Sequence, residues 1–207
     1  MSICHEITLL YFTANKWGYF GDVSVIENEV LCTAYGSDVR LNLRKGNITT
    51  LDNTDSIVNF VYDNDVYGRM GILEAAGDVV IHEYDTKRHQ PDIPYVAYGV
   101  VMTDPGGLSR YKAIFNVKVF AEMAKFKSAI HRTLRLAEIK GMRSIAFPAL
   151  DCSMYKTYAD AYLEMFYEYE NRVRPRCLHM IDIISLQDRD HDYHGEKMKM
   201  MGEKLNL

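Results

Sequence analysis

The run Ser56-Ile-Val-Asn-Phe-Val61 is almost continuously apolar, which is typical of a strand covered on both faces of its sheet. Two comparable runs follow later in the chain, over Ser144-Ile-Ala-Phe147 and from Cys177 to Ile184. The clearest helix lies between the first and second of these runs. From Phe126 to Lys140, apolar side chains recur on one stripe, and Gly141 follows as a cap. This alternation of buried strands with helices predicts a three-layer α/β/α sandwich.

Other segments extend this core towards both ends of the chain. Strands are also predicted at Ile7 to Phe12, Val23 to Ile26, Val30 to Tyr35, Val39 to Arg44, Tyr95 to Thr103 and Lys112 to Lys118. Further helices are predicted at Tyr67 to Ala76, where Gly77 stops the pattern, and at Asp160 to Glu170. A loop-rich stretch is expected after Gly77, and the last twenty residues are interpreted as a solvated helix or a fraying tail. We therefore divide the chain into an N-terminal strand extension (1–40), an α/β core domain (41–186) and a C-terminal tail or helix (187–207).

The composition is that of an ordinary packed chain with one main core. The 207 residues are 48% hydrophobic and 25% charged, which excludes disorder and collagen-like repeats. Acidic residues exceed basic ones, 28 against 24, and give a formal net charge of −4. This balance argues against a broad surface that tracks phosphates. No extended nucleic-acid surface is therefore expected, although a local basic pocket stays open.

The sequence gives no sign of secretion or of a membrane span. The N-terminus lacks the basic region of a signal peptide, and no run approaches the roughly 18 apolar residues of a membrane helix. The four cysteines, Cys4, Cys32, Cys152 and Cys177, are widely spaced and form no C-x-x-C pair, which fits reduced thiols. We therefore predict a cytoplasmic protein.

Common catalytic and metal-binding motifs are missing from the sequence. It contains no P-loop, no G-x-G-x-x-G and no G-x-S-x-G. His191 and His194 lie among acidic residues and could suggest a metal site. A lone H-x-x-H in a charged stretch is weak support for a metal site, and a solvated tail explains it better. No metal and no cofactor are therefore expected.

Five segments carry the strongest functional signal, because they follow one another in a set order on suitable predicted elements. They are Leu43-Arg-Lys-Gly-Asn-Ile-Thr-Thr50, Asp55-Ser-Ile-Val-Asn59, Gly71-Ile-Leu-Glu-Ala-Ala-Gly77, Gly99-Val-Val-Met-Thr103 and Ser144-Ile-Ala-Phe-Pro-Ala-Leu150. In this order and spacing they resemble the macro domain, the ADP-ribose-binding module, over roughly residues 40–185. The resemblance implies a mixed central sheet with a crevice at the carboxyl ends of its central strands, between loops at 62–71 and 151–156.

The resemblance also assigns roles to residues of the first two segments. Gly46-Asn-Ile48 matches the family's glycine-acid-isoleucine turn, in which the acid accepts a hydrogen bond from the adenine amino group. Asn47 replaces the acid here, and its side-chain carbonyl can still accept such a bond. The backbone N–H of Ile48 would donate to the adenine ring. Asn59 matches an asparagine that is usually structural.

Both loops of the expected crevice depart from the family pattern. Tyr62 stands where the family has the asparagine that contacts the distal ribose in its hydrolytic branch. The glycine run that normally follows is reduced to Gly68 and Gly71. In the second loop, glycines give way to Asp151-Cys-Ser-Met-Tyr-Lys156, and this bulk narrows the approach of backbone amides to a diphosphate.

The resemblance thus implies a ligand-binding set and leaves the catalytic residues unassigned. The set comprises Asn47, Ile48, Tyr62, Gly68, Met70, Gly71, Asp151, Cys152, Ser153, Met154 and Tyr155. Lys156 and Arg69 are either sources of compensating charge for a diphosphate or solvated surface residues. Lys118 is near the place of a catalytic lysine in another branch of the family, but a strand-end surface lysine explains it better.

Two main functions are open for this sequence. A third, in which nucleic acid itself is the ligand, is disfavoured by the acidic balance, although recognition of one modified base or terminus stays open. The first is binding of ADP-ribose or a related adenine nucleotide, free or carried by an ADP-ribosylated macromolecule, with hydrolysis of that linkage as an extension. The change at Tyr62 favours a reader, or an atypical hydrolase, over a standard one. The second is an interaction scaffold that retains the macro fold with a degenerate pocket and no catalytic activity.

Overall fold

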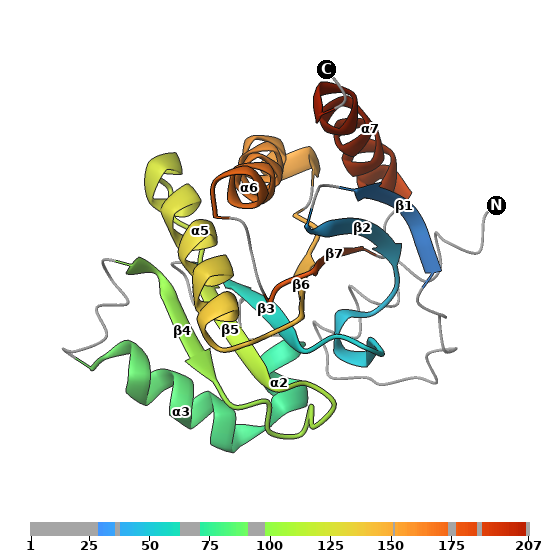
Figure 1. The fold of residues 1–207 in the computed structure, drawn as a ribbon. Coiled ribbons are helices and arrows are strands. Elements are labelled where there is room, and N and C mark those ends of the chain that lie inside the picture. Colours follow the sequence, from blue (N-terminus) through green and yellow to red (C-terminus); the bar gives the residue numbers. More distant parts are fainter. Residues whose placement is uncertain are drawn as a thin grey trace.

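A computed structural model of the chain describes residues 29–35, 38–62, 71–90, 98–150, 152–173, 177–185 and 188–205. Within these residues, seven strands form one sheet in the order β1-β2-β7-β6-β3-β5-β4 (Figure 1). The strands are β1 (Glu29–Tyr35), β2 (Arg40–Lys45), β3 (Ser56–Val61), β4 (Val100–Thr103), β5 (Ala113–Lys118), β6 (Ser144–Pro148) and β7 (Met180–Ser185).

Five neighbouring strands of this sheet are parallel, from β2 through β7, β6 and β3 to β5. The outer strands β1 and β4 run antiparallel to their neighbours β2 and β5. The sheet is therefore mixed, as the resemblance implies. Because the central strands are parallel, their carboxyl ends all lie along one edge of the sheet.

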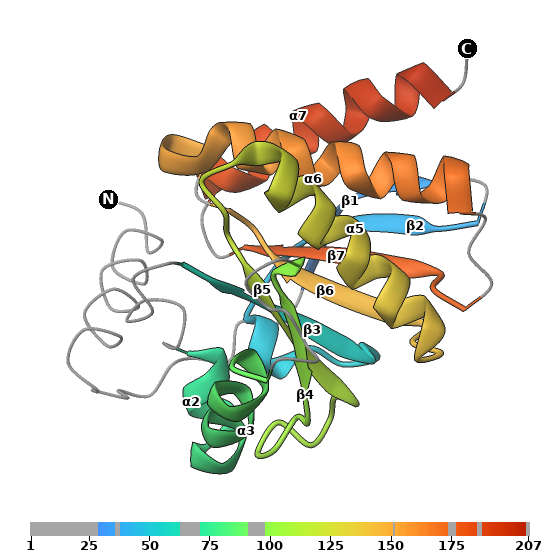
Figure 2. The same cartoon turned by 90° about the vertical axis from the view of Figure 1, so that its left-hand side faces the viewer.

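Helices cover both faces of the sheet and complete three layers (Figure 2). One face carries α5 (Met123–Ile139), α6 (Cys152–Val173) and α7 (Asp188–Leu205). The other face carries α2 (Ile72–Ala76), α3 (Asp78–Arg88) and the short 3-10 helix η1 (Ile48–Thr50). The three-layer α/β/α architecture expected from the sequence is confirmed.

The inner strand β3 shows why its sequence is almost continuously apolar. Val58 and Phe60 belong to the core beneath α5, α6 and α7, whereas Ile57 and Val61 belong to the core beneath α2 and α3. All four side chains are buried. Alternate side chains of a strand point to opposite faces, so a strand between two helical layers carries apolar residues on both of its faces.

Most of the predicted elements are found near their expected bounds. The strands β1, β2, β5, β6 and β7 and the helix α5 are within a few residues of them. β4 begins at Val100, later than expected, and α6 begins at Cys152, eight residues earlier than Asp160. The predicted strands at Ile7 to Phe12 and Val23 to Ile26 lie outside the described residues.

The loop expected after Gly77 is wrong for its first part, because α3 forms there. Gly77, with φ of 95°, ends α2 and also precedes the first residue of α3. α3 buries only Val80 and Tyr84, and most of its other residues are charged or polar. Such a narrow apolar stripe is too weak to indicate a helix beside a glycine that already indicates a stop.

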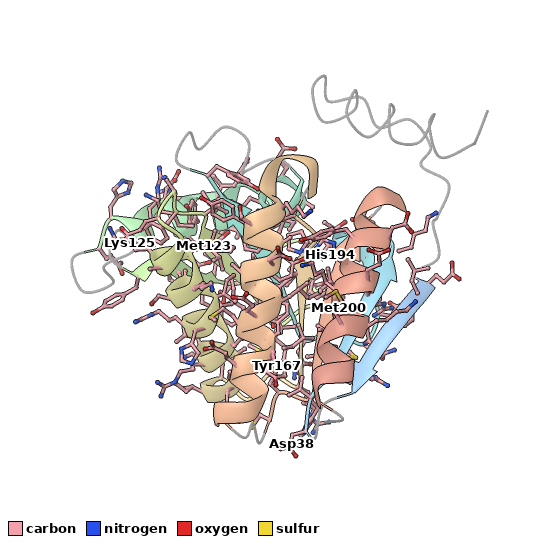
Figure 3. The ribbon with its side chains drawn as sticks, turned by 90° about the horizontal axis from the view of Figure 1, so that it is seen from above. Asp38, Met123, Lys125, Tyr167, His194 and Met200 are labelled. Atoms are coloured by element: carbon pink, nitrogen blue, oxygen red, sulfur yellow. The ribbon has the colours of Figure 1, made fainter. Side chains whose placement is uncertain are left out.

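The last twenty residues form a helix, one of the two expected alternatives, but this helix is not fully solvated, because α7 packs on the sheet and on α6. His194 and Met198 are both buried in this contact. The Tyr162 hydroxyl of α6 lies 2.6 Å from Nε2 of His194, and the two rings stack at 5.8 Å. Figure 3 shows His194 between α6 and α7, with Met200 farther along α7. His194 is therefore a packing residue of the contact between α6 and α7.

The first described strand, β1, and the last helix, α7, both contact the sheet of the core domain. β1 pairs with β2 in the same sheet as the core strands, and α7 packs against that sheet. The division at residues 40 and 187 stays a prediction. Among the described helices, none combines the length and the apolar character needed to cross a bilayer.

The packing of α7 predicts different effects for two of its methionines. Met198→Ala should lower the free energy of unfolding by about 2–5 kcal/mol, because Met198 is buried and truncation leaves a cavity. Met200→Ala is the matched control and should change it by no more than about 0.5 kcal/mol, because Met200 is 53% exposed. Urea unfolding followed by circular dichroism measures both. Equal effects of the two substitutions would contradict the packing of α7.

Candidate functional site

The candidate site lies where the parallel strands end, because ligands of open α/β sheets bind outside the carboxyl ends of the strands. Asn47 follows β2, and Tyr62 follows β3. Leu150 follows β6, and α6 begins two residues later at Cys152. In the strand order, β7 and β6 lie between β2 and β3. The first turn of α6 therefore enters this edge between the segments that carry Asn47 and Tyr62.

The turn after β2 rests on a buried ion pair between β2 and β7. Asp182 is fully buried and accepts hydrogen bonds from Asn42 at 2.6 Å and from Arg44 at 3.0 Å. The backbone N–H of Gly46 then donates to the carbonyl of Ser185 at 3.1 Å. Removal of one partner of such a buried pair is strongly destabilising, so these contacts hold the start of the turn in place.

Asn47 caps the short helix η1 with its own side chain. Its Oδ1 accepts a hydrogen bond from the backbone N–H of Thr49 at 2.9 Å and another from the Thr49 hydroxyl at 2.9 Å. The bond from the backbone N–H identifies this atom as the oxygen, because an amide nitrogen could not accept it.

Both acceptor positions of Oδ1 are thus used within the turn. The sequence analysis expects this oxygen to accept a bond from an adenine amino group. In this conformation, such a group would have to displace Thr49. The amide nitrogen Nδ2 makes no hydrogen bond to another described residue, and it is a donor. The half-buried Asn47 side chain therefore presents a donor where the family's acid would present an acceptor.

Tyr111 anchors the same turn from the segment between β4 and β5. Its hydroxyl donates to the carbonyl of Ile48 at 2.8 Å and accepts from the backbone N–H of Leu51 at 2.8 Å. Burial raises the pKa of Tyr111 from 10.0 to about 12. Arg110 adds a hydrogen bond to the carbonyl of Thr50 at 2.9 Å. The sequence analysis missed both residues, because no local pattern relates them to a turn about sixty residues earlier.

The second predicted loop, 151–156, is largely helical. Residues 152–156 form the first turn of α6, while Asp151 lies outside the described residues. The side chains of Cys152, Ser153, Met154 and Tyr155 also lie outside them, so their predicted contacts stay predictions. The backbone nevertheless matters, because the first turn of a helix carries N–H groups without intrahelical partners.

Lys156 contacts α7. Its ammonium lies 5.2 Å from the centre of the Tyr193 ring, which Lys197 also approaches at 5.7 Å. The Tyr193 hydroxyl donates to Asp160 of α6 at 2.5 Å. The sequence leaves open whether Lys156 supplies charge to a diphosphate or is a surface residue. This placement favours a surface residue, which here contacts α7. Arg69, the other residue in question, lies outside the described residues.

The segment after β3 is described only at its two ends. Tyr62 is half-buried and packs against the core beneath α5 and α6. Gly71 has φ of 100° and precedes α2, which suits glycine because other residues rarely adopt this conformation. Gly68 and Met70 lie outside the described residues.

Two further predicted residues lie on β3 and β5. Asn59 is buried and donates to Asn116 at 2.9 Å, which confirms its structural role. Lys118 ends β5 at the same edge as the candidate site, and its ammonium lies 5.2 Å from the centre of the Phe120 ring. The interpretation of Lys118 as a strand-end surface lysine stays a prediction. The described residues contain no group of three His, Cys, Asp or Glu side chains that could hold a metal ion.

Sequence comparisons do not identify a family, whereas structural comparison does identify a fold. No family model matches the sequence, and no curated protein does. The Oceanobacillus iheyensis macrodomain with ADP matches at a TM-score of 0.68 and 19% identity, over 84% of this chain and 97% of that one. A mutant of that macrodomain with ADPR matches at a TM-score of 0.68 and 18% identity, over 83% of this chain and 98% of that one. A Trypanosoma brucei macrodomain matches at a TM-score of 0.63 and 17% identity, over 95% of this chain and 88% of that one. The chain has the macro fold.

This likeness extends beyond the segments that suggest it in the sequence. The resemblance covers roughly residues 40–185, whereas the matched structures span most of the chain. At such low identities the likeness shows the fold. The chemistry of this macro-fold protein must therefore be argued from its own residues.

The anchoring role of Tyr111 predicts a pH dependence of stability. The unfolded phenol ionises near pH 10.0 and the folded one near 12, so between these values the unfolded state binds fewer protons. The free energy of unfolding should therefore fall as the pH rises through this window, and Tyr111→Phe should fall less steeply. Below pH 9 the same variant should be less stable than the wild type by about 1–3 kcal/mol, because the N–H of Leu51 and the carbonyl of Ile48 lose their partner.

Urea unfolding at a series of alkaline pH values measures this effect. Tyr98→Phe is the control, because it also removes one phenol hydroxyl, but from a side chain that is 47% exposed. Parallel curves for the wild type and Tyr111→Phe would contradict the anchoring role.

Proposed function

We propose that this macro-fold protein binds ADP-ribose or a related adenine nucleotide at the carboxyl edge of its sheet. One observation supports the proposal most directly. The strand order brings the turn at Asn47, the first turn of α6 and the segment after β3 to the same edge. Structures with this fold include a macrodomain with ADP and one with ADPR.

The chemistry of these three contributions sets the orientation of the ligand. The base lies against Asn47 and the backbone N–H of Ile48. The diphosphate lies at the first turn of α6, where unpaired N–H groups and the helix dipole favour negative charge. α6 has 22 residues, so this dipole is fully developed at its N-terminus. The distal ribose extends towards Tyr62 and the residues after β3.

Asn47 would recognise the base differently from the acid that the resemblance places at this position. Because its Oδ1 is bonded to Thr49, its Nδ2 donates to a ring nitrogen of the purine and leaves the amino group without an acceptor from this residue. Binding of adenine therefore rests on fewer specific hydrogen bonds than with a carboxylate at this position. We expect affinity in the micromolar range rather than tighter.

We further propose that the protein acts as a reader rather than as a standard hydrolase. Tyr62 replaces the asparagine that the resemblance associates with the hydrolytic branch, and Tyr62 is half-buried against the core. The ammonium groups of Lys118 and Lys156 each lie over an aromatic ring. A macromolecule that carries ADP-ribose is then the partner, and the cytoplasm is the proposed location.

Calorimetric titration with ADP-ribose tests the proposed function. Binding is expected for ADP-ribose and for ADP, and weaker binding for ribose 5-phosphate, which lacks the base, one ribose and one phosphate. Absence of heat at high micromolar concentrations, together with an unchanged melting temperature, would leave the interaction scaffold as the better account. Incubation with a mono-ADP-ribosylated protein then separates a reader from a hydrolase, because only a hydrolase releases free ADP-ribose.

The bonding of Asn47 predicts a gain of affinity from one substitution. Asn47→Asp replaces the donor Nδ2 with a second acceptor oxygen, while the first oxygen keeps its bonds to Thr49. Affinity for ADP-ribose should rise about tenfold, the value of one hydrogen bond to a charged acceptor. Affinity for the inosine analogue, which lacks the amino group, should not rise.

Asn53→Asp is the matched control for the added charge. Asn53 is exposed and precedes β3, at the opposite edge of the sheet. It should leave the affinity for ADP-ribose unchanged. Equal gains for ADP-ribose and the inosine analogue, or a gain from the control, would overturn the role of Asn47.

A further inference from the structure

The outer face of α5 carries a concentration of positive charge that the candidate site does not use. The helix contains Lys125, Lys127, Arg132 and Arg135 but only one carboxylate, Glu138. Glu138 turns inward and accepts hydrogen bonds from the backbone N–H groups of Cys177 and Leu178, both at 2.9 Å. The one acidic side chain of α5 is half-buried and bonds to these backbone groups, and it makes no ion pair with the described cations of the helix.

The exposed residues of α5 form one continuous stripe. Lys125, Ser128, Arg132, Arg135 and Ile139 follow at spacings of three and four residues, and all are exposed. Residues separated in this way share one side of a helix. We call them the α5 stripe. It is continued past the helix by the exposed residues Lys140 and Arg143. Lys125 and Arg135 are about 15 Å apart along the helix axis.

Most of this charge is not neutralised by other described residues. Lys127 lies beside the stripe and is paired with Glu164 of α6. Within the stripe, Lys125 pairs with Glu122 at 2.8 Å, and both side chains are more than half exposed, so this pair is weak. Arg135 makes no ion pair with a described residue. Figure 3 shows Lys125 on the flank of α5 that faces away from α6.

An exposed aromatic ring stands beside the stripe. The guanidinium of Arg132 lies 4.1 Å from the centre of the Tyr98 ring, and Tyr98 is 47% exposed. This pair offers flat, partly apolar surfaces next to a row of cations. Bases stack on rings and on guanidinium planes, while the cations contact phosphates, and this combination is characteristic of proteins that bind single strands.

We propose that the α5 stripe, together with Tyr98, binds single-stranded nucleic acid. An acidic peptide would match the charge but would leave the Arg132–Tyr98 pair without a stacking partner. A membrane surface would need more apolar groups to insert than Ile139 alone provides. The net charge of −4 predicts no extended nucleic-acid surface, and a stripe along one helix is the kind of local exception that net charge cannot reveal.

The position of the stripe relates it to the candidate site. α5 follows β5, so its first residues lie at the carboxyl edge, where Met123 begins the helix. A strand bound along α5 therefore has one end beside the candidate site. The proposal itself does not depend on nucleotide recognition there, and its test uses an unmodified strand without ADP-ribose.

Fluorescence anisotropy with a labelled oligothymidylate of about 12 nucleotides tests the proposal, because this length covers a typical single-strand site. Binding should weaken as salt rises, with a slope of log K against log salt of about −3 for four phosphate contacts.

Arg135→Glu should weaken binding about five- to tenfold and reduce this slope by about 1. Lys199→Glu is the matched control, because Lys199 is an exposed residue of α7 and the charge change is the same. It should alter affinity less than twofold.

Two further variants separate stacking from charge. Tyr98→Ala should weaken binding about fivefold or more without changing the salt slope, because it removes a stacking surface and no charge. Arg132→Lys keeps the charge and should also weaken binding, because an ammonium cannot stack as a guanidinium does. If Arg135→Glu does not fold, Lys140→Glu replaces it, with the same expected direction.

Several outcomes would overturn the proposal. They are absence of binding at low salt, equal losses from Arg135→Glu and Lys199→Glu, and competition by oligoglutamate as effective as that by oligothymidylate. Duplex DNA that binds as tightly as the single strand would also overturn it. The α5 variants should leave binding of ADP-ribose unchanged, so a failure of this proposal and a failure of the proposed function give different results.

Discussion

The burial of four parallel strands, β3, β5, β6 and β7, on both faces is the constraint on which the rest of the structure depends. Because helices cover both faces, the chain can present polar loops only where the strands end. Because the strands are parallel, their carboxyl ends share one edge. Asn47, Tyr62 and the first turn of α6 are far apart in the sequence, and this arrangement alone brings them to one side of the molecule.

The sheet could be predicted from the sequence because strand burial leaves a local signal. The apolar runs at Ser56–Val61 and Ser144–Pro148 need no information from distant residues. The helices at the margins leave weaker signals. The burial of His194 depends on a bond to Tyr162, which is 32 residues away, and α3 buries only two side chains. A charged or histidine-containing helix can therefore belong to the core with only a narrow apolar stripe.

The sequence predicts the edge of the sheet at which the candidate site lies. It does not predict which hydrogen bonds the side chains of the site make. Asn47 lies at the expected edge, yet the use of its oxygen by Thr49 depends on the backbone of a turn. That turn is held by Tyr111, which comes from between β4 and β5. The resemblance identifies positions, whereas the direction of each hydrogen bond depends on neighbours that no motif contains. Lys156 is a second example, because its ammonium lies over the ring of Tyr193 on α7, a contact that no motif contains.

The buried amides of β3 and β5 have a consequence for the alignment of the short strand β4. Asn116 accepts a bond from Asn59 and donates to the Thr103 hydroxyl at 3.2 Å. A shift of β4 by one residue would turn Thr103 to the opposite face and leave the Asn116 amide without that partner. The polar contact thus selects one register for a strand of only four residues. It thereby also sets the starting point of the connection that carries Tyr111 to the Asn47 turn.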